Sequence, residues 1–88
     1  MTKLIRNIQF TKLIKADGKL KEFNFRKPNG SPEALFTVDV IDGRGNRLIF
    51  NMKYVNKEWK IIGAELPSWI TENESVFNKI IETELQQM

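Results

Sequence analysis

The side chains that most often perform acid–base, nucleophilic and metal chemistry are scarce in this sequence. It has no histidine and no cysteine, so the commonest general base and metal ligand is missing, and so is the thiolate nucleophile. Asp39 and Asp42 lie three residues apart on one predicted strand and therefore point to opposite faces. Asp42 also falls at a predicted turn, where aspartate is common. The sequence thus predicts no metal site, no cofactor and no catalytic residue, and we expect a protein that is not an enzyme.

Two other motifs are typical of catalytic or phosphate-binding sites only in a context that this chain lacks. Ser31, Ser68 and Ser75 lie in no Gly-x-Ser-x-Gly motif, and the chain has no histidine to activate them. Gly43 and Gly45 form a Gly-x-Gly pair. A phosphate-binding loop of that kind leads from a strand into a helix, whereas these glycines join two predicted antiparallel strands. The pair therefore indicates a hairpin.

Basic residues are concentrated in the first third of the chain and acidic residues in the last. Residues 1–27 hold eight basic and two acidic side chains, a net charge of +6, whereas residues 64–88 have a net charge of −4. A basic segment can attract phosphates, so a nucleic-acid-binding module is the alternative function. Its candidate residues are Lys12, Lys15, Lys19, Lys21, Arg26 and Lys27. The total charge of only +3 favours instead a basic hairpin that faces an acidic helix of the same fold.

Short turn sequences fix the register of most of a predicted sheet. Asp17-Gly18 favours a two-residue hairpin turn, which pairs Phe10 with Phe25. A second two-residue turn pairs Tyr54 with Trp59, and a three-residue glycine loop keeps the apolar side chains of its two strands on one face. The predicted strands are at about 5–15, 20–27, 34–42, 46–55 and 58–64. The predicted buried aromatic residues are Phe10, Phe23, Phe25, Phe36, Phe50, Tyr54 and Trp59.

Helical spacing replaces strand alternation near the end of the chain. Thr71 and Glu74 predict a capping box. An earlier start, with Pro67 as the first helical residue, is the alternative. The apolar residues Ile70, Phe77, Ile80, Ile81 and Leu85 then recur at helical intervals. We expect one amphipathic helix at about 69–86, with its apolar stripe on the aromatic side of the sheet. The sequence therefore predicts the α+β class: a five-stranded antiparallel β-meander with one C-terminal α-helix packed on one face, in a single domain over residues 1–88.

The opposite, outer face of this sheet holds the residues that we consider candidates for binding a partner. By the same alternation it carries the aliphatic side chains Leu35, Ile41, Ile49 and Ile62. Exposed apolar patches often mark interaction surfaces. We therefore expect a small non-enzymatic interaction domain that binds protein or itself, as a homodimer, through this face or through an edge strand. The sequence has no secretory signal, lipidation motif or apolar span, which predicts a cytoplasmic protein with no membrane partner. The pairing between strands 20–27 and 34–42 stays open, because a longer loop joins them.

Overall fold

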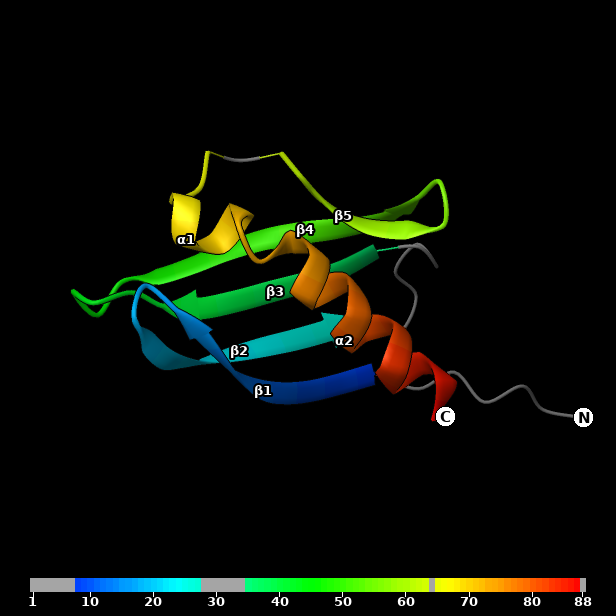
Figure 1. Ribbon diagram of the computed structural model, residues 1–88, viewed down its shortest axis with the longest axis horizontal. Coiled ribbons are helices and arrows are strands. Elements are labelled where there is room, and N and C mark those ends of the chain that lie inside the picture. Colours follow the sequence, from blue (N-terminus) through cyan, green and yellow to red (C-terminus); the bar gives the residue numbers. More distant parts are fainter. Residues whose placement is uncertain (1–7, 28–34, 64, 88) are drawn as a thin grey trace, which may run out of the picture.

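Five strands and two helical segments make up the described part of the chain. The structure, a computed structural model, describes residues 8–27, 35–63 and 65–87. Its strands are β1 (Ile8–Ala16), β2 (Lys19–Lys27), β3 (Leu35–Ile41), β4 (Arg47–Val55) and β5 (Glu58–Ile62). They form one antiparallel sheet in chain order, and α1 (Ser68–Thr71) and α2 (Glu74–Gln86) follow it (Figure 1). The predicted meander with a C-terminal helix on one face is confirmed. The strand residues predicted at 5–7, 34 and 64 lie outside the described residues.

The turns set the register in the way their sequences predict. Phe10 pairs with Phe25 across the first hairpin, and Tyr54 pairs with Trp59 across the last. Asp17 and Gly18 both have positive φ, 56° and 74°, as a two-residue turn that matches the strand twist requires. The loop between β3 and β4 closes with a 2.8 Å hydrogen bond from the Asp42 N–H to the Asn46 carbonyl. Three turns therefore agree on which side chains face α2.

The core lies between the aromatic face of the sheet and α2. Phe77 is fully buried, with its ring centroid 5.1 Å from that of Phe23 and 5.7 Å from that of Phe50. Ile81 is fully buried one helical turn further on. Tyr54 was predicted to be buried but is 45% exposed. It lies at the last turn of the sheet, where Trp59 packs against its ring at 5.2 Å and water reaches the other side.

The helix predicted as one piece over 69–86 is broken between α1 and α2. In a continuous helix the Asn73 N–H would bond the Trp69 carbonyl. Here the Asn73 side-chain amide donates to that carbonyl at 2.8 Å, and its backbone N–H donates to Ile70 instead. The side chain thus competes with the helical backbone. The predicted capping box is wrong for a related reason: the Glu74 carboxylate is bonded elsewhere, to the Ile61 N–H at 2.8 Å.

Helix α2 crosses the sheet diagonally and connects both of its edges (Figure 1). At its start, Glu74 and Asn78 accept hydrogen bonds from the backbone N–H groups of Ile61 and Trp59 in β5. Near its end, Glu84 forms an ion pair of 3.1 Å with Lys12 of β1. An exposed strand edge has unpaired backbone N–H and C=O groups, which can pair with another chain. Because α2 side chains bond two of its N–H groups, the edge of β5 is partly closed to such pairing.

Candidate functional site on the outer face of the sheet

The side of the sheet that faces away from α2, here called the outer face, has no second layer within the described part of the chain. Both α1 and α2 place their buried side chains, Ile70 and then Phe77 and Ile81, in the aromatic core. Strand alternation and register assign the outer face its members. They include Thr11, Leu13, Asn24, Arg26, Thr37, Asp39, Ile41, Arg47, Ile49, Asn51 and Ile62.

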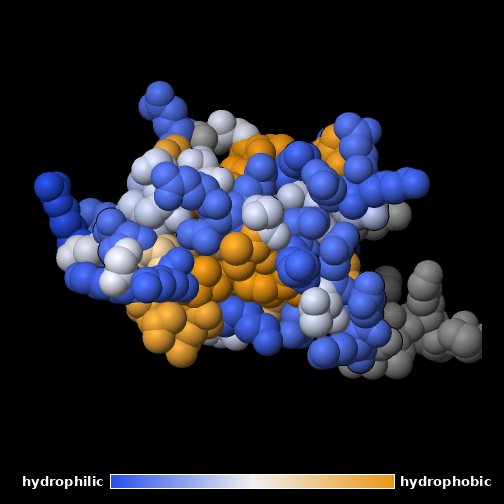
Figure 2. All heavy atoms as spheres, in the orientation of Figure 1, coloured by the Kyte–Doolittle hydropathy of each residue, from blue (hydrophilic) through white to orange (hydrophobic). Residues whose placement is uncertain are grey.

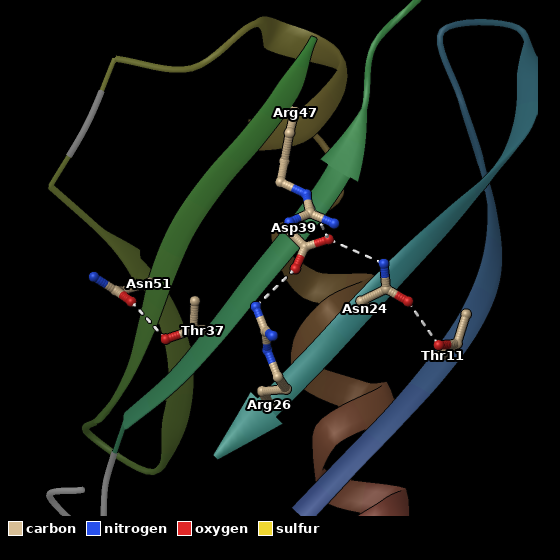
Figure 3. A network of polar contacts seen from close by, with 7 residues as sticks. All are labelled: Thr11, Asn24, Arg26, Thr37, Asp39, Arg47 and Asn51. Atoms are coloured by element: carbon tan, nitrogen blue, oxygen red, sulfur yellow. Dashed lines mark hydrogen bonds and ion pairs between the residues drawn. The ribbon is translucent and has the colours of Figure 1, made fainter. Parts of the chain in front are cut away.

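Asp39 is almost completely buried at the middle of this face. Its exposed fraction is 2%. Its carboxylate accepts a hydrogen bond of 2.9 Å from Asn24 Nδ2 and one of 3.1 Å from Arg26 Nη2 (Figure 3). The Thr11 hydroxyl extends the network by donating to Asn24 Oδ1 at 2.7 Å. A carboxylate can be buried in this way because charged and amide donors replace the water that it loses.

A second guanidinium completes the surroundings of Asp39. Arg47 reaches over from β4, and its Nε lies 3.9 Å from Asp39 Oδ1. Both arginine side chains remain well exposed, 44% for Arg26 and 59% for Arg47. Beside them is a polar hollow of about 160 Å³. Its lining residues are Gln9, Thr11, Asn24, Arg26, Asp39 and Arg47. The site therefore presents two cations around one buried anion, which suits binding a charged group and offers no free acid or base.

Three of the four aliphatic candidates form a line across the outer face. Ile41 pairs with Arg47, and Ile49 lies two residues further along the same strand, so these isoleucines are diagonal neighbours. Ile62 pairs with Asn51, which makes it the diagonal neighbour of Ile49 on the other side. Diagonal neighbours in a sheet are within reach of each other's long side chains. The three, which we call the isoleucine diagonal, are 48%, 54% and 37% exposed.

Leu35 does not join this line. It is half-buried and pairs with Lys53, at the far end of β3 from Ile41. The Thr37–Asn51 pair separates it from the isoleucine diagonal, and a side-chain hydrogen bond of 3.1 Å links these two residues. The structure therefore brings together Ile41, Ile49 and Ile62.

The basic residues of the alternative function are divided between the two faces. Lys15 and Arg26 lie on the outer face, whereas the other four, Lys12, Lys19, Lys21 and Lys27, alternate with them toward the helix side. Three of the six already have partners: Lys12 pairs with Glu84, Arg26 with Asp39, and the Lys21 ammonium lies 5.0 Å from the centre of the Trp69 ring. The structure thus does not gather them into one exposed stripe.

A second hollow lies on the helix side of the molecule, between β1 and α2. It has a volume of about 280 Å³, and its lining residues are Lys12, Val76, Lys79, Ile80, Thr83 and Glu84. Figure 2 shows hydrophobic side chains gathered on this side of the molecule, in the middle of the view. The Lys12–Glu84 ion pair forms part of the lining. This hollow lies where α2 passes over β1.

The described ranges contain neither a metal-ligating cluster nor a membrane-spanning helix. No group of three or more acidic side chains lies close enough to hold a metal ion in residues 8–27, 35–63 and 65–87. None of the helices in those ranges is long and apolar enough to cross a membrane. Ser31 lies outside the described residues, and Ser68 and Ser75 are exposed.

The network around Asp39 was not visible in the sequence. It depends on the pairing of Asn24 with Asp39, which belongs to the one strand pair whose register no short turn fixes. The only signal was the alternation of polar residues along β2 and β3. Comparisons of this chain with protein-family models, with curated proteins and with solved structures find no match.

Proposed function

We propose that this chain is a small non-enzymatic interaction domain that binds protein, in the first instance a second copy of itself, through the outer face. The observation that carries the proposal is the isoleucine diagonal on a sheet face that no second layer of the described residues covers. Contiguous apolar side chains exposed to water are unfavourable, and covering them on association is the main favourable term. A second chain would supply the missing layer.

The polar part of the face supports binding rather than catalysis. Asp39 is 2% exposed, and each of its carboxylate oxygens accepts a hydrogen bond, one from Asn24 and one from Arg26, so a substrate has little access to it as a general base. In protein interfaces an apolar centre is commonly bordered by polar side chains, with arginine enriched. The isoleucine diagonal beside Arg26 and Arg47 has this arrangement. A face that carries both parts can also meet its own copy around a two-fold axis.

Self-association gives the direct test of this proposal. The mass of the wild-type protein, measured by light scattering over a range of concentrations, should rise from monomer toward dimer. Ile49→Lys combined with Ile62→Lys should keep the chain monomeric while leaving its thermal melt cooperative, because both side chains are exposed. Val76→Lys is the matched control, since Val76 is a similarly exposed aliphatic residue on α2. It should associate as the wild type does.

Two results would count against self-association through the outer face. A wild-type chain that keeps the monomer mass at the highest concentration would contradict self-association. Equal loss of association in the Val76→Lys variant would place the contact on the helix side instead.

A further inference from the structure

We propose that the hollow beside Asp39 is a carboxylate-binding subsite, which receives an acidic side chain of the protein chain that docks on the outer face. The inference rests on the proposed function and adds the chemistry of the partner. It starts from the two guanidiniums, Arg26 and Arg47, that border the hollow. Arginine is the side chain best suited to grip a carboxylate, because its planar fork donates two parallel hydrogen bonds.

Most of the N–H donors of both arginine side chains make no hydrogen bond within the described part of the chain. Arg26 donates one side-chain hydrogen bond there, from Nη2 to Asp39, out of the five N–H groups that a guanidinium carries. Arg47 approaches Asp39 only to 3.9 Å, which is an ion pair beyond hydrogen-bond distance. Each side chain is about half exposed. Among the described residues, donors therefore remain for a second acceptor.

Asp39 organises the subsite instead of filling it. Asp39 is 2% exposed, and its carboxylate holds Arg26 in place through the 3.1 Å hydrogen bond. Asn24 fixes the other oxygen of Asp39 at 2.9 Å and is itself fixed by Thr11. Pre-organised donors lose less freedom when they bind a ligand. The network thus acts as a built support for the two cations.

The charge balance selects a carboxylate over a phosphate. Two arginines and one aspartate leave the hollow with a single net positive charge, which one carboxylate neutralises and a phosphate dianion exceeds. The hollow of about 160 Å³ also borders the isoleucine diagonal, since Arg47 pairs directly with Ile41. A partner segment with an acidic side chain next to apolar ones would satisfy both parts of the outer face.

A titration with defined peptides tests the subsite. The protein is held below the concentration range of any self-association, and a hexaglutamate peptide is added at constant ionic strength, with hexaglutamine as the uncharged control. Nuclear magnetic resonance follows the side-chain N–H signals of Asn24, Arg26 and Arg47. We expect saturable shifts at these signals with hexaglutamate, none with hexaglutamine, and weaker binding of inorganic phosphate.

Matched variants separate the subsite from general charge attraction. Arg47→Gln should weaken hexaglutamate binding about tenfold, the scale of one lost charge-assisted hydrogen-bond pair. Arg47→Lys should recover only part of the loss, because lysine keeps the charge and lacks the fork. Lys53→Gln removes the same charge from the same face, away from the hollow, and should change the affinity less than twofold. Thermal melts of all three variants confirm that they are folded.

Several outcomes would overturn the inference. They are equal losses in Arg47→Gln and Lys53→Gln, phosphate binding that exceeds hexaglutamate binding, or the absence of shifts at the arginines. Failure here is distinguishable from failure of the proposed function. If the Ile49 and Ile62 substitutions abolish association while hexaglutamate causes no shift of the arginine signals, the proposed interaction domain is supported and the carboxylate subsite is refuted.

Discussion

Replacing Asp39 by alanine would remove the centre of the outer-face network. The change deletes the acceptors of two hydrogen bonds, 2.9 Å from Asn24 and 3.1 Å from Arg26. Hydrogen bonds to charged groups contribute about 1.5–3 kcal/mol each, and an exposed ion pair only about 0.2–1 kcal/mol. Because Arg26 is 44% exposed, water can replace its lost partner, whereas the part-buried Asn24 amide loses its acceptor. We therefore expect the free energy of unfolding to fall by about 2–3 kcal/mol.

Urea unfolding followed by circular dichroism would measure this loss. Arg26→Ala and the double variant complete a double-mutant cycle, and we expect a coupling energy between Asp39 and Arg26 of about 0.5–1.5 kcal/mol. Glu22→Ala serves as the control, since Glu22 is an exposed carboxylate on the same face, and it should change stability by no more than about 0.5 kcal/mol. An Asp39→Ala loss as small as that of the control would refute the reasoning. It would mean that the arginines cover Asp39 without bonding it.

Three further predictions concern the core, the hairpin loop and nucleic acid. Phe77→Ala should lower the free energy of unfolding by roughly 3–5 kcal/mol, as buried aromatic truncations do; a loss below about 1 kcal/mol in urea unfolding would place Phe77 at the surface. The pKa of Asp42 is lowered from its ordinary value of 3.8, chiefly because the Asn46 N–H donates to its carboxylate. Its stabilisation should be complete above about pH 4 and lost as the pH falls through the folded-state pKa. The protection factor of the Asn46 amide, which is its exchange rate compared with that of an unstructured amide at the same pH, should therefore fall in acid, and Asp42→Asn should remove that dependence. Oligonucleotides should bind weakly and lose affinity steeply with salt, as counterion release requires; submicromolar binding at physiological salt, measured by fluorescence anisotropy, would support the nucleic-acid alternative.

Loop length explains how much of the sheet could be predicted. Two-residue turns after Ala16 and Val55 admit one register each, so the pairs around Phe10 and Trp59 followed directly from the sequence. Strands β2 and β3 are joined by residues 28–34, a length that fits several registers. The Asn24–Asp39 pair belongs to that junction. The burial of Asp39 could therefore not be predicted from the sequence, although strand alternation already placed Asp39 on the outer face.

The errors in the predicted helix have local causes. The helical spacing of Ile70 and Phe77 was correct, because a break of two residues hardly rotates the later turns out of phase. What the spacing could not show was that Asn73 bonds the Trp69 carbonyl with its side chain. The capping pattern of Thr71 and Glu74 was likewise ambiguous, since a glutamate at that position can reach a neighbouring strand as well as its own backbone.

The candidate site could be predicted only in part, because strand alternation gives the face on which a residue lies but not its neighbours across the strands. Alternation alone assigns Ile41, Ile49 and Ile62 to one face, and it does the same for Leu35. Only the cross-strand register shows that three of them are neighbours and that the fourth stands apart. The arginine hollow requires contacts among four strands, which one sequence does not contain.

The order of the strands has a consequence for how the chain folds. Each strand pairs only with its neighbour along the chain, so the sheet can grow by closing one short segment after another, at a low entropic cost for each closure. Helix α2 is different, because the Lys12–Glu84 pair joins opposite ends of the sequence. We expect the hairpins to form in the rate-limiting step and the helix to dock after it, so that Phe77→Leu speeds unfolding while hardly slowing refolding. Stopped-flow kinetics in urea would show the reverse if the helix belonged to the folding nucleus.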